Sequence, residues 1–122
     1  MAKQTQIDSN ALRGHLETMI LSALEARESH GFDVLQRLEA AGFGALRMKE
    51  GSLYPALYRL EEQGHVTSRW ENDNDERPGA GRRGPKRKLY KLTRKGKRKL
   101  DQGREHWSVF VSVIGGIIGV PA

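Results

Sequence analysis

The sequence predicts a mainly α-helical fold with one small β-hairpin, in the order helix, helix, helix, hairpin, helix. Apolar residues recur every three or four positions in four stretches, which is typical of helices packed on a core. Between the third and fourth stretches, two short segments alternate apolar and polar residues, which is typical of paired strands. The 122 residues are enough for one domain with a modest core.

The composition excludes several classes of protein. The chain has no cysteine, which rules out disulfides and cysteine-based zinc sites. The first residues lack the apolar core of a signal peptide. The longest apolar run, 109–120, is interrupted by Ser112 and three glycines. It is also shorter than the roughly 20 residues that a membrane-spanning helix needs. We therefore expect a cytoplasmic protein without a membrane segment.

The positive charge of the chain is concentrated in one region. The whole chain has a net charge of +6. The stretch from Arg77 to Arg104 contains thirteen Lys or Arg and a single acid, Asp101. Such a basic stripe is expected of a protein that binds a polyanion. A solvated basic tail is the alternative, but Leu89 and Tyr90 lie within the run and indicate folded structure there.

The first helix is expected from about Asn10 to Glu28, because Asp8, Ser9 and Asn10 are good N-cap residues. Its apolar stripe consists of Leu12, Leu16, Met19, Ile20, Ala23 and Leu24. The second helix is expected over 31–41, with Phe32, Val34, Leu35 and Leu38 buried. Residues 46–48 could form a very short strand.

The third helix is expected from near Ser52 to Gly64, a residue type that commonly ends helices. Pro55 has no N–H to donate, so we place it in the first turn. Free backbone N–H groups at such a helix start attract phosphate. The core face carries Leu53, Leu57 and Leu60, and the other faces carry Ser52, Tyr54, Tyr58 and Arg59.

The two strands are expected over 66–70 and 87–92, paired antiparallel, with a long acidic and then arginine-rich loop between them. Thr93 is a good N-cap for the last helix, which begins basic and turns apolar. We expect that helix to fray around Gly115 and Gly116. This order of elements is that of a winged helix-turn-helix with one added C-terminal helix, so we expect DNA binding.

Two stretches carry a resemblance to a known family. They are EGSLYPALYRLEEQGHV at 50–66 and GRRGPKRKLYKLTRKGKRKL at 81–100, with HGFDVLQRL at 30–38 in support. They resemble the winged-helix domain of the PadR family of bacterial transcriptional regulators. The resemblance covers about Leu12 to Trp107. The short C-terminal part of the chain resembles that of family members with a single dimerisation helix after the hairpin, which is called the wing.

The resemblance implies a homodimeric regulator of transcription, most simply a repressor on a palindromic operator, without a cofactor. It divides the chain into a DNA-binding domain (1–93), whose first helix also contributes to the dimer, and a dimerisation helix with a glycine-rich tail (94–122). The double-stranded DNA contacts it implies are Lys49, Ser52, Tyr54, Tyr58, Arg59, Arg82, Arg83, Lys86, Arg87 and Lys88.

The dimer is expected to form between the last helix and the first. Trp107 either packs in its hydrophobic core or stacks on a small aromatic effector, since some regulators of this family sense aromatic compounds. The expected dimer residues are Leu12, Leu16, Met19, Ile20, Trp107, Phe110, Val111 and Ile114.

Alternatives remain for two contacts and for the function. Tyr54 could pack under the wing, and Arg59 could pair with Glu61 or Glu62. An enzyme is not expected, because the four histidines form no catalytic or metal-binding motif. A structural protein that binds nucleic acid without sequence preference would need only the basic run, and an adaptor for a protein partner would bind no DNA.

Overall fold

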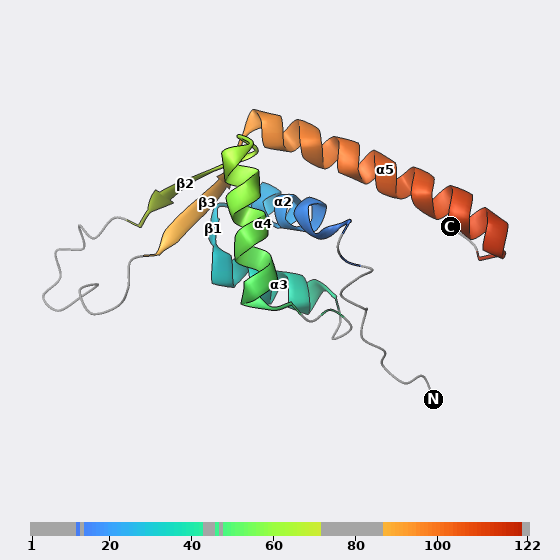
Figure 1. Cartoon of the computed structure of the whole chain (residues 1–122), viewed down its shortest axis with the longest axis horizontal. Helices are drawn as coiled ribbons and strands as arrows, with labels where there is room; N and C mark the ends of the chain where they lie inside the picture. The colour runs from blue at the N-terminus through green and yellow to red at the C-terminus, as the bar shows by residue number, and fades with distance from the viewer. Residues whose placement is uncertain (1–11, 13, 43–45, 47, 72–86, 121–122) are drawn as a thin grey trace, which may run out of the picture.

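The structure is a computed structural model that describes residues 12, 14–42, 46, 48–71 and 87–120. Three helices form a body beside a small sheet, and a long last helix crosses this body and extends well beyond it (Figure 1). The elements are α2 (Leu16–Ala26), β1 (Ser29–His30), α3 (Gly31–Ala41), α4 (Glu50–Glu62), β2 (Val66–Trp70), β3 (Lys88–Leu92) and α5 (Arg94–Ile118).

The core lies where α2, α3, α4 and the start of α5 meet. The leucine stripe of α4 is fully buried, as predicted, at Leu53, Leu57 and Leu60. Ile20 of α2 and Leu100 of α5 are equally buried in the same cluster. Burial of each such side chain stabilises the fold by roughly 1.5–3 kcal/mol, so this cluster fixes the orientation of α4.

The sheet has three antiparallel strands in the order β1-β3-β2. The predicted hairpin is confirmed, with Val66 opposite Leu92 and Trp70 opposite Lys88. The strand β1 was not predicted, because a two-residue strand leaves no alternating pattern in the sequence. Within β1, Ser29 pairs with Tyr90 of β3. Neither Leu46 nor Met48 lies in a strand, so the short strand expected there is wrong at these two residues.

The junction between α4, β2 and α5 is closely packed and includes both predicted caps. Gly64 follows α4 with a φ of 81°, and the Thr93 side chain accepts a hydrogen bond of 2.9 Å from the Gly96 N–H. The Thr93 hydroxyl also donates to the Gly64 carbonyl at 2.7 Å. A Cβ on Gly96 would lie only 2.0 Å from the His65 carbonyl oxygen, so this crossing requires glycine.

Several predicted helix boundaries are wrong. A turn at Gly14 and His15 interrupts the first helix, and its second part ends at Ala26 rather than at Glu28. The expected N-caps at 8–10 lie outside the described residues. The helix α4 begins at Glu50, which puts Pro55 in the second turn. The helix α5 continues through both glycines to Ile118 and ends at the left-handed Gly119.

Phe32 is 51% exposed, which corrects its predicted burial. At 100° per residue, Phe32 lies about 100° from the stripe of Val34, Leu35 and Leu38, on the same flank of α3 as Gln36. The other three apolar residues are buried as expected. The exposed ring of Phe32 therefore belongs to the surface next to the sheet.

Candidate nucleic-acid interface

The outward face of α4 carries the side chains expected to contact DNA. Lys49, at the N-cap, and Ser52, in the first turn, are exposed. Tyr58 is 62% exposed and lies one helical turn after Tyr54, opposite the leucine stripe. The basic N-cap and the free N–H groups of the first turn make this end of α4 favourable for a phosphate.

Tyr54 is held between α4 and the start of α3. A Cβ on Gly31 would lie 2.6 Å from Cε1 of Tyr54, so the ring sits directly on the Gly31 backbone. Desolvation of the hydroxyl and the nearby Glu50 carboxylate raise the pKa of Tyr54 above its ordinary value. The side chain is still 39% exposed. The Tyr54 ring thus packs on the start of α3, and its exposed part is accessible to a ligand.

The base of the hairpin faces the same space as Tyr54. Trp70 closes β2, and the Lys88 Nζ lies 5.2 Å from the centre of its ring in a cation–π contact. A cleft of about 760 Å³ is lined by Tyr54, Trp70, Arg87 and Lys88, together with residues of α3. The helix start and the wing base are therefore neighbours on one face. Arg82, Arg83 and Lys86 lie outside the described residues.

Polar contacts fix the hairpin against the helices. The Ser68 hydroxyl donates to the Glu61 carboxylate of α4. The Arg69 guanidinium lies 2.8 Å from the Glu28 carboxylate, and His30 Nε2 lies 2.8 Å from the Glu71 carboxylate. Exposed pairs of this kind contribute about 0–1 kcal/mol each, so their main effect is to orient the hairpin.

Arg59 points away from this face. Its Nε lies 3.2 Å from the Glu17 carboxylate of α2, and not beside Glu61 or Glu62. Glu17 also lies 3.7 Å from the Lys99 Nζ of α5. The predicted alternative of an ion pair is therefore correct in kind but wrong in partner, because Arg59 lies on the flank of α4 that faces α2.

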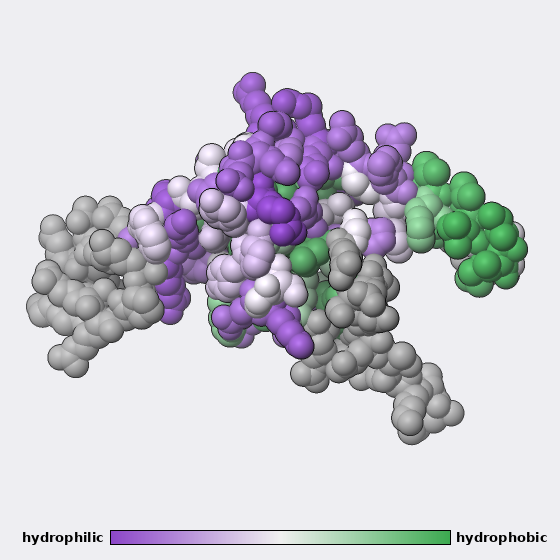
Figure 2. Space-filling view, in the orientation of Figure 1, coloured by the Kyte–Doolittle hydropathy of each residue, from purple (hydrophilic) through white to green (hydrophobic). Residues whose placement is uncertain are grey.

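A second surface lies on the distal half of α5, where apolar side chains gather at the far end of the molecule (Figure 2). Trp107 is 51% exposed, and its ring stacks on Phe110 with centroids 5.8 Å apart. The ring of His15 meets Trp107 edge-on at 5.1 Å. The other apolar side chains exposed along this half are Val109, Val113, Ile114, Ile117, Ile118 and Val120.

A groove of about 670 Å³ runs between this surface and α2, lined in part by Leu12, Met19 and Trp107. Leu12, Leu16 and Met19 are partly buried against the core, and Val111 is half-buried. Ile20 is fully buried within the chain, which corrects its assignment to a dimer surface. The stripe of the first helix thus faces two ways, with Ile20 toward the core and Leu12 toward the groove.

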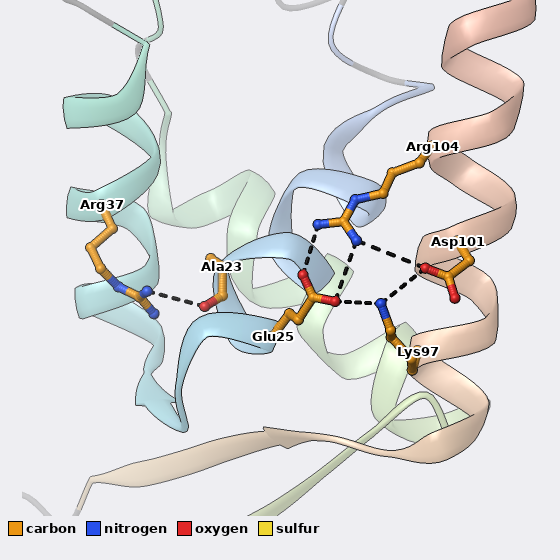
Figure 3. A network of polar contacts seen from close by, with 6 residues as sticks. All are labelled: Ala23, Glu25, Arg37, Lys97, Asp101 and Arg104. Carbon is orange, nitrogen blue, oxygen red and sulfur yellow. Dashed lines mark hydrogen bonds and ion pairs between the residues drawn. The ribbon is translucent and has the colours of Figure 1, made fainter.

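Figure 3 shows how α5 is attached to α2. The Glu25 carboxylate accepts from the Arg104 guanidinium at 2.7 Å and from the Lys97 ammonium. These hydrogen bonds lower the pKa of Glu25 to about 2. Asp101 lies 3.0 Å from the same Lys97 ammonium. A Cβ on Gly103 would lie 2.5 Å from the Thr18 hydroxyl, so the two helices cross closely here.

Sequence reasoning missed two residues of the wing-side surface. Trp70 is predicted as a strand residue but not as part of a site, although an aromatic residue at a hairpin end next to basic residues is a signal for one. Phe32 is predicted in the core.

Among the described residues, no helix is long and apolar enough to cross a membrane.

Comparison with known proteins gives a consistent result. Residues 20–102 match the family described as Transcriptional regulator PadR-like. A transcriptional regulator from Clostridium thermocellum is 27% identical, with a TM-score of 0.77 over 90% of this chain and 96% of that one. A PadR-like transcription factor from Bacteroides fragilis is 30% identical, with a TM-score of 0.69 over 89% of this chain and 95% of that one.

Curated sequences extend the comparison. The transcriptional regulator YqjI of Escherichia coli is 30% identical over 92 residues, which are 75% of this chain and 39% of YqjI. The chain therefore spans well under half the length of that relative. A protein of Lysinibacillus sphaericus described as uncharacterized is 26% identical over 88% of this chain and 92% of its own length.

Proposed function

The chain belongs to the PadR-like family of transcriptional regulators, which are not enzymes, and from this premise we propose that it is a homodimeric repressor of a palindromic operator. Each α4 would enter a major groove, with the half-sites about one turn (roughly 34 Å) apart or a multiple of that. The cytoplasm, where such a protein meets DNA, is its proposed location.

One observation carries the proposal. Tyr54 at the start of α4 and Arg87 and Lys88 at the wing base line a single cleft, so helix and hairpin present their polar groups to the same partner. A duplex is broad and negatively charged, and it can touch both elements at once. Phosphate contacts would give affinity, and contacts to base edges would choose the site.

We propose one role for each residue of the expected DNA contacts. Lys49, Ser52, Tyr54 and Tyr58 would contact phosphates or base edges from α4. Because Arg59 is paired with Glu17, we assign it to holding α4 against α2. The wing contacts would be Arg82, Arg83, Lys86, Arg87 and Lys88. In this division 1–93 is the DNA-binding part and 94–122 the dimerising part.

The proposed dimer surface is the distal half of α5. Trp107, Phe110 and Ile114 are 41–51% exposed, and exposed apolar patches of this kind mark protein interaction sites. A second copy of the chain would cover them through a two-fold contact of α5 with α5, and of α5 with the other copy's Leu12 and the Met19 side of its α2.

An effector could enter at Trp107. The half-exposed indole borders the groove of about 670 Å³, and a planar aromatic compound could stack on it in the dimer. Titration with planar cationic dyes, followed by tryptophan fluorescence, tests this role. Saturable quenching that is lost in Trp107→Phe supports it, and no quenching across a panel of dyes contradicts it.

Selection of bound duplexes from a random pool tests the main proposal. We expect an inverted repeat, because a two-fold protein reads the same half-site twice. With about 6–10 phosphate contacts, affinity should fall by about 10³–10⁵ between 50 and 200 mM salt. A selected site without symmetry would contradict the dimer, and no enriched site would contradict the operator.

The alternative is a structural protein that binds nucleic acid without sequence preference. The thirteen basic residues between Arg77 and Arg104 are the observation that favours it. Competition with random duplex separates the two functions. A repressor keeps its preferred site in excess random duplex, whereas the structural protein releases it in proportion to the competitor.

A further inference from the structure

We propose that the cleft between the start of α3, the start of α4 and the wing base, here called the wing-base cleft, binds a free purine nucleoside monophosphate. The base would stack against Phe32 and lie beside Trp70, whose ring centre is 5.2 Å from the Lys88 ammonium, and the phosphate would rest on Arg87 and that ammonium. All four side chains line the cleft. The sheet and α3 lie apart from the distal half of α5 (Figure 1), and the lining of the cleft shares no residue with the groove that Trp107 borders.

The aromatic lining has more open surface than the fold requires. Phe32 is 51% exposed, Trp70 is 56% exposed and Tyr54 is 39% exposed, while Tyr90 is buried at the floor. Three half-open rings around one cleft expose apolar area to water that a planar ligand would cover. Stacking of a base on aromatic side chains of this kind strengthens binding by about tenfold to a hundredfold.

The charge of the cleft favours an anion. Arg87 and Lys88 line it directly. The carboxylate within its lining, Asp33, lies 3.7 Å from the Arg27 guanidinium and 3.6 Å from that of Arg37, so its charge is already compensated. The Tyr54 hydroxyl remains protonated at neutral pH and can donate to a phosphate oxygen. The same cleft therefore combines rings for a base with donors for a phosphate.

The remaining lining distinguishes a nucleotide from a simple aromatic acid. Gln36 also lines the cleft from α3, and its amide can pair with a donor and an acceptor on the edge of a purine. A hydrocarbon ring would offer this amide no such partner. The volume of about 760 Å³ lies within the range of about 300–1,000 Å³ typical of ligand pockets.

Binding of this nucleotide would regulate DNA binding, a step that rests on the proposed function. Tyr54, Arg87 and Lys88 are proposed to contact the duplex, and the same three side chains line the cleft. A nucleotide seated there would neutralise the wing base and cover one side of Tyr54. Nucleotide and duplex should therefore exclude each other.

Titration of the full chain with GMP and AMP, followed through the tryptophan indole N–H signals, tests the site. The two signals are assigned with Trp107→Phe. We expect the Trp70 signal to shift saturably while the Trp107 signal stays in place. Guanosine, which lacks the phosphate, and ribose 5-phosphate, which lacks the base, should each bind at least about tenfold more weakly. Equal binding of guanosine and GMP, or a shift of Trp107 alone, would overturn the assignment.

Variants separate the cleft from general charge. Phe32→Ala and the double change Arg87→Ala with Lys88→Ala should each weaken GMP binding by about tenfold or more. Phe110→Ala, which removes an aromatic ring of similar exposure on α5, is the matched control and should leave GMP binding unchanged. Loss of binding in Phe110→Ala together with unchanged binding in Phe32→Ala would contradict the proposal.

A base with a phosphate could come from a free nucleotide or from a nucleotide within DNA. Binding of a short single-stranded oligonucleotide distinguishes the two. If GMP binds more tightly per site than the oligonucleotide, the ligand of the cleft is a free nucleotide. If the oligonucleotide binds more tightly, the ligand is an unstacked nucleotide of DNA and the proposal of a free nucleotide is wrong. Duplex binding is measured first without nucleotide. Its absence would contradict the proposed function, while the Trp70 shift would still stand. Simultaneous binding of duplex and GMP would overturn only the competition.

Discussion

Two aromatic surfaces of the molecule differ in what surrounds them. At the wing base, Tyr54 and Trp70 share their cleft with Arg87 and Lys88. On α5, the stacked rings of Trp107 and Phe110 lie among aliphatic side chains such as Val113 and Ile114. The rings themselves are exposed to a similar extent in the two places.

The difference teaches that an exposed ring does not by itself identify its partner. Next to cations, a ring is suited to a base or a sugar-phosphate, because stacking and charge act together. Next to aliphatic residues, a ring is suited to another apolar surface, which a second copy of the chain would supply. Four experiments break or sharpen this contrast, in order of decreasing expected effect.

Phe110→Asp should have the largest effect. A carboxylate in the middle of the apolar surface of α5 would have to be desolvated in a dimer, so we expect a monomer by analytical ultracentrifugation. Loss of the second DNA-binding half should lower operator affinity by about 10²–10⁴. Phe32→Asp, a matched change at the wing base, should leave the dimer intact. A Phe110→Asp protein that remains dimeric would contradict this assignment of the surface.

The double change Arg87→Ala with Lys88→Ala should weaken DNA binding by about tenfold for each of the two cations removed. It should also reduce the slope of log affinity against log salt by about 1.8, since each neutralised phosphate contributes about 0.9. Arg94→Ala with Arg98→Ala removes equal charge from the exposed start of α5 and is the control. Equal slopes for the two double variants would mean that the wing base does not touch the duplex.

Gly31→Ala should destabilise the protein through the Tyr54 ring. The new methyl group would lie 2.6 Å from Cε1 of Tyr54, and overpacking of this kind costs about 1–3 kcal/mol of unfolding free energy. In a Tyr54→Ala background the same change should cost much less. Chemical denaturation of the four proteins of this cycle measures the coupling. If Gly31→Ala lowers the unfolding free energy as much in the Tyr54→Ala background as in the original protein, a contact other than the Tyr54 ring causes the destabilisation.

The smallest expected effect is the change in stability with pH that the ionisation of Glu25 causes. Its folded-state pKa of about 2 lies below the ordinary 4.5, so folding favours the ionised form. The stabilisation is complete above about pH 4.5 and is lost as the pH falls through about 2. An NMR titration should give this midpoint, and Arg104→Ala should move it upward. Arg98→Ala, on the same helix, should leave the midpoint in place.

Much of the fold could be predicted because its signals are local. The left-handed Gly64 and the Thr93 cap depend on a few neighbouring residues, and the structure confirms both. The alternation over 66–70 and 87–92 predicted both strands of the hairpin, which the structure has at Val66–Trp70 and Lys88–Leu92. The leucine stripe of α4 predicted its buried face for the same reason.

The features that were missed depend on tertiary contacts. The strand β1 exists only because Ser29 and His30 meet β3 across the fold. Arg59 pairs with a carboxylate on α2, which no spacing within α4 could indicate. The position of Trp70 beside Tyr54 likewise follows from how the hairpin packs on α3 and α4. The candidate site could thus be predicted in its residue types but not in its grouping.

The pairing of β1 with β3 also sets an order of assembly. Ser29 and Tyr90 are far apart in the chain, and forming such a contact carries the entropy cost of closing a long loop. During synthesis, α2, α3 and α4 emerge from the ribosome well before β3 does. A nascent chain therefore carries α2, α3 and α4 before Tyr90 of β3 and Leu100 of α5 can complete their core, and the proposed DNA surface is assembled only after that.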